Sequence, residues 1–306
     1  MKNILQVGDI AGIPQLLADR TGGKVVVFKE HSFGYSSPNQ IVMDFKYEQP
    51  ISGMLRFIGV FKFARDYDII HFHWGTLLPC KFDLLIWKKI GIKTYLHYRG
   101  SEIRGKKWKH SLSFAKTADK IFVSTPDLLQ YADGAEWVPN PVDLQKISFV
   151  GSRKIKKTVR ILHAPSIREK KGTGTIERAV ESVQAKGYSI EFICLTGVCH
   201  DIILEEMRKA DIIIDQIRPD IGSFGNISLE AMATGKPVLC TISEFNDRYY
   251  GVCPIVPIRT GTVEEIEEKI VKLIDNPELR ETLGSLGREY VEKNHDVDKI
   301  VARLYA

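Results

Sequence analysis

The sequence predicts an α/β protein built from two doubly wound domains. Short apolar runs bounded by turn signals alternate with helical patterns, which favours parallel strands joined by helices. This alternation occurs twice along the chain, before and after a segment rich in strand and helix breakers. The length of 306 residues agrees with this division, because domains of about 150 residues are usual.

The first series of elements occupies the N-terminal half. Asp9 interrupts the apolar start of the chain too early for a signal-peptide core, so we expect a first strand there. The runs that predict buried strands are Ile4–Val7, Lys24–Phe28, Asp68–His73, Lys93–Leu96 and Lys120–Val123. Helical patterns lie between them, at Gly53–Arg65 and Lys81–Ile90.

A second series begins near residue 158. Its predicted strands are Val159–Leu162, Ile190–Leu195, Ile212–Asp215, Pro237–Thr241 and Pro254–Ile258. Its predicted helices are Gly172–Lys186, Asp201–Lys209, Asn226–Thr234 and Val263–Asp275. The tail from Pro277 to Ala306 has a helical pattern and no strand-like run.

Two features place the domain boundary between residues 139 and 157. Residues 139–143 are rich in breakers, and the charge run 153–157 is typical of a solvated linker. The predicted domains are residues 1–147 and 148–285. A terminal helix over residues 286–306 is a candidate to cross back to the first domain.

Composition excludes several classes of protein. The chain is 44% hydrophobic and 26% charged, which argues against disorder, a fibre or a coiled coil. No apolar run reaches the roughly 18–20 residues of a membrane span. The five cysteines are scattered without a C-x-x-C pair, so we expect reduced thiols and a cytoplasmic location rather than disulfides or a zinc site.

Charge is distributed unevenly between the two halves. The first 150 residues carry 20 Lys and Arg against 14 Asp and Glu, whereas the rest carry 23 against 24. A basic N-terminal half favours an anionic partner. Its residues 104–110 read RGKKWKH. This run is either an exposed loop and helix start, or a patch for an anionic lipid head group or an acidic glycan; no nucleic-acid-binding motif accompanies it.

The stretch after the predicted strand Ile212–Asp215 carries the clearest chemical signal. A loop containing Gly222 and Gly225 leads into a helix that opens near Asn226. A helix N-terminus suits a phosphate group. Glu230 lies about one turn into the helix, where a carboxylate can accept two hydrogen bonds from a vicinal diol such as a ribose. The alternative is an ordinary loop with a glutamate that faces solvent.

Residues 224–238 read FGNISLEAMATGKPV, which resembles the donor-site signature of the GT-B glycosyltransferases, closest to their retaining family four. The resemblance implies that the loop and helix start receive the diphosphate of a nucleotide sugar and that Glu230 binds the ribose. Residues 163–173, HAPSIREKKGT, look like the family's loop in which the lysine matching Lys171 contacts the diphosphate. The alternative for Lys171 is a surface lysine near a helix start. Residues 138–143, VPNPVD, are similar to the family's entry to the interdomain linker.

Three positions depart from the family pattern. Gly222 stands where the family often has a glutamate, and Ser166 stands where it usually has an arginine. Arg99 replaces the histidine of the N-terminal His-Gly motif. We therefore consider Arg168, Arg218 and Arg99 as replacements for the missing contacts.

The candidate site residues form three sets. The donor-binding set is Gly12, Ser166, Arg168, Lys171, Gly222, Ser223, Phe224, Gly225, Asn226 and Glu230. The acceptor-side set is His73, Trp74, Arg99, Arg104, Lys106 and Lys107. The catalytic set is Lys171, Arg99 and Glu230.

Histidines in the first domain raise the question of a metal. His71 and His73 share one face of a strand, but the sequence shows no third ligand nearby, so we expect them to pack in the core or line a cleft. His97 is expected to be a core histidine. We predict no metal and no cofactor.

The resemblance implies a GT-B fold, in which two Rossmann-like domains face a cleft, the first on the acceptor side and the second binding the donor. The implied activity is retaining transfer of a sugar from a nucleotide-diphosphate sugar to an acceptor hydroxyl of a glycan, glycolipid or protein glycan. The chain would be cytoplasmic, either free or peripheral on the inner face of an anionic membrane, without nucleic acid as a partner. The alternatives are a non-catalytic nucleotide-binding scaffold and a nucleotide-sugar epimerase of the same architecture.

Overall fold

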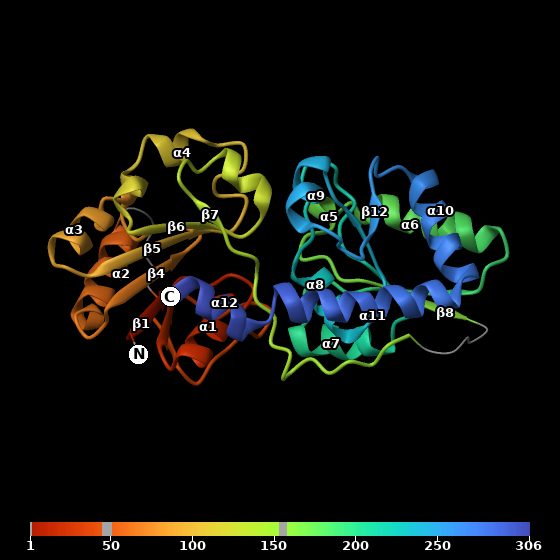
Figure 1. Ribbon diagram of the computed structural model, residues 1–306, viewed down its shortest axis with the longest axis horizontal. Coiled ribbons are helices and arrows are strands. Elements are labelled where there is room, and N and C mark those ends of the chain that lie inside the picture. The colour runs from red at the N-terminus through yellow and green to blue at the C-terminus, as the bar shows by residue number, and fades with distance from the viewer. Residues whose placement is uncertain (1, 45–50, 153–157) are drawn as a thin grey trace. The chain divides into compact units, whose positions relative to one another are not determined.

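The computed structural model describes residues 2–44, 51–152 and 158–306 (Figure 1). The charge run predicted as a linker, 153–157, lies outside these residues. The chain divides into two compact units, the first comprising Met1–Pro141 with Val297–Ala306 and the second Val142–Asp296. No helix in the described ranges is both long and apolar enough to cross a bilayer.

The first unit contains a parallel sheet with strand order β3-β2-β1-β4-β5-β6-β7. Its strands are β1 (Ile4–Val7), β2 (Lys24–Val27), β3 (Gln40–Val42), β4 (Ile69–His73), β5 (Lys93–Tyr98), β6 (Lys120–Val123) and β7 (Glu136–Trp137). Its helices are α1 (Ile13–Thr21), α2 (Ile51–Ala64), α3 (Asp83–Lys89), α4 (Trp108–Ser111) and α12 (Val297–Tyr305). Short 3-10 helices are η1 (Pro79–Lys81), η2 (Phe114–Thr117) and η3 (Pro126–Gln130).

Alternate residues of this sheet serve two different cores. Leu5, Ile70 and Leu96 pack with α2 and α3 on one face, whereas Ile4 and Ile69 pack on the other with α1 and α12. The period of two residues along each strand produces this division. The C-terminal helix α12 therefore forms part of the first unit's core.

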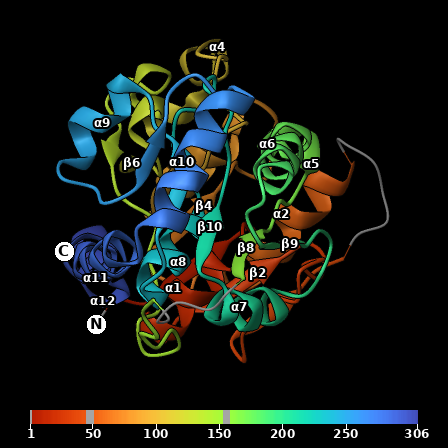
Figure 2. The same cartoon turned by 90° about the vertical axis from the view of Figure 1, so that its right-hand side faces the viewer.

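The second unit contains a parallel sheet with strand order β12-β11-β10-β8-β9. Its strands are β8 (Val159–His163), β9 (Ile190–Cys194), β10 (Ile212–Ile214), β11 (Val238–Thr241) and β12 (Val256–Ile258). Its helices are α5 (Arg168–Lys171), α6 (Thr173–Ala185), α7 (His200–Lys209), α8 (Asn226–Thr234), α9 (Glu244–Tyr250), α10 (Val263–Asp275) and α11 (Pro277–Asn294). Figures 1 and 2 show α6 and α10 over one face of the sheet, and α7 and α8 over the other.

Every predicted strand and helix is present, and both sheets are parallel, so the predicted fold class is confirmed. The elements that were not predicted include β3, β7, α1, α5 and α9 and the 3-10 helices η2 and η3. The two strands are only three and two residues long, which is too short for a periodic pattern. Gly12 and Pro14 open α1, and these residues read as breakers in the sequence.

Candidate functional site

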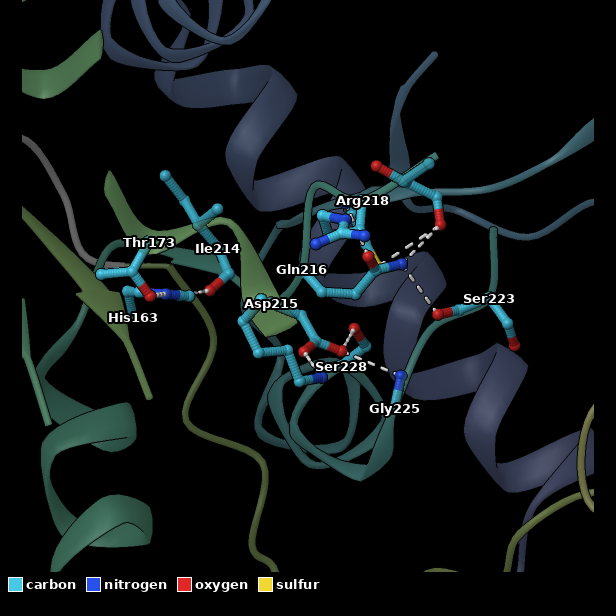
Figure 3. Close-up of polar contacts among 12 residues, drawn as sticks. His163, Thr173, Ile214, Asp215, Gln216, Arg218, Ser223, Gly225 and Ser228 are labelled. Carbon is cyan, nitrogen blue, oxygen red and sulfur yellow. Dashed lines mark hydrogen bonds and ion pairs between the residues drawn. The ribbon is translucent and has the colours of Figure 1, made fainter. Parts of the chain in front are cut away.

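The carboxylate of Asp215 lies at the centre of the predicted donor loop (Figure 3). Asp215 follows β10 directly, and its Oδ1 atom accepts a 2.7 Å hydrogen bond from Lys171 Nζ. Its Oδ2 atom accepts bonds from the Gly225 N–H and the Ser228 hydroxyl, both 2.8 Å long. One buried acid therefore holds the lysine of α5 and the first turn of α8 together.

This ion pair is asymmetric in its exposure. The Asp215 side chain is 2% exposed and that of Lys171 is 22% exposed. Burial would raise the pKa of Asp215, but the Lys171 charge and the three hydrogen bonds outweigh burial and lower it. Burial conversely opposes the charge on Lys171, and Asp215 restores it, so that the pKa of Lys171 is raised. Both groups are charged at neutral pH, and the lysine is the one that solvent reaches.

The loop between β10 and α8 is fixed by buried polar side chains. Gln216 Nε2 donates to the carbonyls of Ser223, at 3.0 Å, and Thr241, at 3.2 Å, and its Oε1 accepts from the Arg218 N–H (Figure 3). The Ser223 hydroxyl lies 2.7 Å from that of Tyr250. Sequence reasoning did not single out Gln216, although it directly follows the aspartate at the strand end.

Gly222 departs from the family pattern for a conformational reason. Its φ is +56°, and a Cβ at this position would lie 2.6 Å from Ser243 Cβ. Because only glycine adopts this conformation without strain, no glutamate fits here in the observed loop.

Glu230 lies one turn into α8, as predicted, and is buried. Its Oε1 atom is 2.8 Å from His200 Nε2, and its Oε2 atom is buried without a partner among the described residues. Burial opposes protonation of His200, but the bond and charge of Glu230 outweigh it and raise the histidine's pKa. His200 was missed by sequence reasoning. Its only signal in the sequence was its position directly before the predicted helix Asp201–Lys209.

Two arginines that the sequence offered as replacement cations already have carboxylate partners. Arg168 Nη2 lies 2.6 Å from Glu177 Oε1, and Arg218 forms a two-point pair with Asp220 at 2.7 and 2.8 Å. Ser166 is exposed in the loop after β8. Of the other predicted donor residues, Phe224 is buried against Tyr250, and Asn226 begins α8. Gly12 lies in the first unit, where it caps α1.

A second polar centre lies in the first unit, at the carboxyl ends of β4 and β5. Arg99 follows β5, and its Nη2 atom is 2.6 Å from His73 Nδ1 while its Nη1 atom donates to Asn140 Oδ1 at 2.9 Å. Burial lowers the pKa of Arg99 to about 9, which leaves it charged at pH 7. Glu102 accepts a bond from the Arg99 backbone N–H.

The structure brings a third histidine to the pair that the sequence identified. His97 pairs with His73 in the sheet register, and ligand atoms of His71, His73 and His97 lie within 4.8 Å of one another. Burial, and the nearby charge of Arg99, hold the pKa of all three well below the usual range. Both ring nitrogens of His73 are occupied, one by Arg99 and the other by Gln6 at 2.8 Å.

The remaining acceptor-side candidates differ in their exposure and in their side-chain partners. Trp74 is exposed and has a φ of +78°. Arg104 is paired with Asp127 at 2.6 Å, and Lys107 with Asp133 at 2.8 Å. Lys106 Nζ donates to the Ser101 carbonyl. The structure therefore places Arg99 against His73 and turns the lysines toward loop partners.

Comparison with known proteins gives one relative in sequence. No known family profile matches the chain. The chain is 25% identical over 291 residues to a protein of Methanocaldococcus jannaschii named an uncharacterized glycosyltransferase, covering 83% of this chain and 81% of the relative.

Solved structures resemble the whole chain at low sequence identity. HepE from Anabaena, crystallised with UDP and glucose, is 14% identical with a TM-score of 0.68, covering 99% of this chain and 98% of HepE. Sucrose-phosphate synthase from Thermosynechococcus elongatus is also 14% identical, with a TM-score of 0.66 and coverage of 99% and 97%. A UDP-forming trehalose-phosphate synthase from Burkholderia xenovorans has a TM-score of 0.69 at 10% identity, with coverage of 99% and 98%. The chain thus has the GT-B fold and resembles the glycosyltransferases that share it, while its place in family four stays a prediction.

Proposed function

We propose that this protein is a retaining glycosyltransferase that moves a sugar from a nucleotide-diphosphate sugar to an acceptor hydroxyl. The observation that carries the proposal is the Lys171–Asp215 pair at the start of α8, with Glu230 one turn further along. UDP is the first nucleotide to test, because HepE was crystallised with it.

Lys171 is the group that would stabilise the leaving diphosphate. An ammonium carries three N–H donors, and Asp215 accepts one of them. The others can meet phosphate oxygens as negative charge develops. Asp215 acts as a positioning residue, because its bonds to Gly225 and Ser228 fix the lysine relative to the helix start. The proposed chemistry takes this charge stabilisation from the protein and requires no metal.

Glu230 is the group that would hold the ribose. His200 binds one carboxylate oxygen and leaves the other, Oε2, without a partner among the described side chains. A ribose hydroxyl can donate to that oxygen. His200 would then orient the carboxylate without competing for the same atom.

A thermal-shift panel tests the donor pocket. The ligands are UDP, GDP, ADP, TDP and CMP with their sugars, and the variants are Glu230→Gln and the exposed control Glu181→Gln on α6. A ligand at 100 times its Kd adds about 2.7 kcal/mol, or about 5–10 °C in Tm for a domain of this size. We expect one nucleotide to stabilise the wild type and the control, and most of that shift to disappear in Glu230→Gln. No shift with any nucleotide, or equal shifts in all three proteins, would overturn the assignment.

An epimerase is the second candidate. A structure described as a putative UDP-N-acetylglucosamine 2-epimerase from Listeria monocytogenes resembles the chain with a TM-score of 0.64. Product analysis separates the two activities, since a transferase releases the nucleoside diphosphate with a new glycoside. An epimerase changes the sugar's configuration.

We also propose that the first unit contacts an anionic membrane. Trp108 and Leu112 are 59% and 77% exposed on and beside α4, and Phe114 is exposed in η2. Lys106 and Lys107 are exposed directly before them. Apolar side chains beside a basic run suit a bilayer rich in anionic lipid.

Liposome sedimentation tests this contact. We expect the protein to bind vesicles with 30–40% phosphatidylglycerol, on the order of the anionic content that basic patches require, and not neutral vesicles. Reversing Lys106 and Lys107 to Glu should abolish binding, whereas reversing the exposed Lys272 and Lys293 of the second unit should not. Equal loss of vesicle binding in both variants would show that binding depends on net charge alone, and would contradict a defined membrane-binding surface at Lys106 and Lys107.

A further inference from the structure

The Arg99 guanidinium forms no ion pair with a carboxylate in the described part of the chain, although the nearby charge of Glu102 acts to raise its pKa. Its two side-chain contacts are to an imidazole and an amide oxygen, both neutral, and its Nε atom is buried without a partner among the described residues. Arg104, Arg168 and Arg218 by contrast each form an ion pair with an acid. Holding a charged group away from water with neutral partners costs several kcal/mol.

A chain of hydrogen bonds holds His73 as an acceptor toward this arginine. Because a guanidinium only donates, His73 Nδ1 must accept, and its proton lies on Nε2, which donates to Gln6 Oε1. Gln6 Nε2 donates to Tyr305 Oη at 2.8 Å. The Tyr305 hydroxyl then donates to His71 Nδ1, 2.7 Å away. Tyr305, in the C-terminal helix α12, thereby orients Gln6 and supports the tautomer of His73 that accepts a hydrogen bond from Arg99.

None of these groups can neutralise the arginine. The three buried histidines resist protonation, and burial raises the pKa of Tyr305, so the network stays neutral at physiological pH. Glu102 binds the Arg99 backbone N–H and forms no side-chain hydrogen bond with the guanidinium, but its nearby charge supports that of the arginine. The network therefore orients the guanidinium and leaves its charge available.

The surroundings of Arg99 indicate that this charge faces a ligand. Arg99 is half-buried as a whole residue. It lies at the carboxyl ends of parallel strands, where α/β folds bind ligands. Trp74, which follows His73, is 46% exposed, and its φ of +78° is rare for a bulky residue. Such backbone strain is concentrated at functional sites.

We propose that Arg99 binds an oxyanion, a carboxylate or a phosphate, carried by a substrate. This deepens the proposed function and rests on it, because the ligand would be either an acidic acceptor glycan or the phosphates of the donor. Trp74, directly after His73 in the chain, supplies an exposed aromatic side chain. His73, Gln6 and Tyr305 are positioning residues for the guanidinium.

Ligand binding followed by tryptophan fluorescence and calorimetry tests the proposal. The probes are glucuronate, inorganic phosphate and, as the neutral match, glucose. The variants are Arg99→Gln, Arg99→Lys and the control Arg65→Gln, which removes an exposed charge from the same unit. We expect glucuronate or phosphate, and not glucose, to bind the wild type and the control. A charge-assisted hydrogen bond predicts about 10- to 100-fold weaker binding in Arg99→Gln.

Two further arms make the result decisive. If Arg99→Gln does not fold, Arg99→Lys still tests the proposal. Lysine keeps the positive charge but lacks the planar pair of N–H donors of the guanidinium, so weaker anion binding in that variant supports the proposal. Tyr305→Phe keeps Arg99 and removes the hydroxyl of the relay, so we expect a few-fold weaker anion binding. Anion binding that is the same in wild type, Arg99→Lys and Arg99→Gln would overturn the proposal.

Competition with UDP identifies the source of the oxyanion. Glucuronate that binds in the presence of saturating UDP, with UDP affinity unchanged in Arg99→Lys, indicates an acidic acceptor. Loss of UDP affinity in Arg99→Lys together with absent glucuronate binding indicates the donor phosphates. Failure of every nucleotide to bind, with anion binding intact, would contradict the proposed function and not the Arg99 site.

Discussion

Two buried polar centres lie at the carboxyl ends of the two sheets, and they balance their charge differently. In the second unit, the ammonium of Lys171 is matched by the carboxylate of Asp215. In the first unit, the guanidinium of Arg99 contacts a neutral imidazole and an amide. The first arrangement contains its own counter-charge, whereas we propose that the second acquires one from a ligand.

This difference in charge balance determines what each centre can contribute to ligand binding. Lys171 meets a phosphate only with part of its charge, because Asp215 stays beside it. Its proposed role is to place the diphosphate accurately and to offset part of the charge that develops on it. Arg99 offers a full charge, and its cost to the fold is recovered when an anion binds.

The largest effect should come from removing one partner of the compensated pair. Asp215→Ala leaves the Lys171 ammonium unpaired and frees the Gly225 N–H and the Ser228 hydroxyl. We expect a loss of about 3–5 kcal/mol in the free energy of unfolding, measured by urea denaturation and far-UV circular dichroism. The double change of Asp215→Leu with Lys171→Met should cost clearly less than the single one. Equal costs would show that the pair does not stabilise the second unit.

Acid should weaken the first unit through its histidines. Burial holds the pKa of His71, His73 and His97 well below 6.5 in the folded state. The unfolded chain therefore takes up protons first, and stability falls as the pH drops below about 6.5. Each histidine contributes about 1.4 kcal/mol per pH unit in that range.

The tryptophans make this loss measurable in one unit. Trp74, Trp87, Trp108 and Trp137 all belong to the first unit, so tryptophan fluorescence reports that unit alone. His97→Phe removes a ring whose two nitrogens have no partner among the described residues, and we expect a shallower pH dependence. An unchanged slope of stability against pH in His97→Phe would contradict the assignment of the acid sensitivity to the buried histidines.

A smaller loss is expected at Gly222. Restoring the family's residue with Gly222→Glu places a side chain at φ +56° against Ser243, which should cost about 1–3 kcal/mol. Gly225→Ala, with φ at −102°, avoids that backbone strain and is the matched comparison. A Gly222→Glu protein of unchanged Tm would show that the loop adopts another conformation.

The smallest effect concerns His200. Its pKa is raised by Glu230, so the pair's contribution is complete below about pH 6.5 and is lost as the pH rises through the higher folded value. We expect His200→Ala to weaken nucleotide binding a few-fold and to remove this pH dependence from the binding constant. Calorimetry between pH 6 and 8.5 measures it, with Glu230→Gln as the variant that should abolish the same dependence.

Much of this fold could be predicted from the sequence, because buried parallel strands and amphipathic helices leave periodic signals. The start of α8 and the position of Glu230 one turn into it followed from the same signals and from the resemblance. Asp215 was assigned only to a strand end, since nothing local shows that its carboxylate would meet Lys171, 44 residues away.

Other features depend on contacts or conformations that sequence reasoning could not supply. The pairing of His97 with His73 depends on the register between two strands. Tyr305 lies 234 residues from the histidine that it contacts. A glycine at position 222 permits a positive φ, but the fit of the loop against Ser243 that makes it a requirement is a tertiary contact.

The central claim is that the second unit binds a nucleotide sugar and that Lys171 assists departure of the diphosphate. The most direct test measures nucleoside diphosphate release from a panel of UDP-, GDP- and ADP-sugars by wild type and Lys171→Met, with binding of the donor measured in parallel. We expect release by the wild type with one nucleotide, and a loss of about 100-fold or more in Lys171→Met, as when a catalytic charge contact is removed. Donor binding without release by the wild type, or equal release by both proteins, would contradict it.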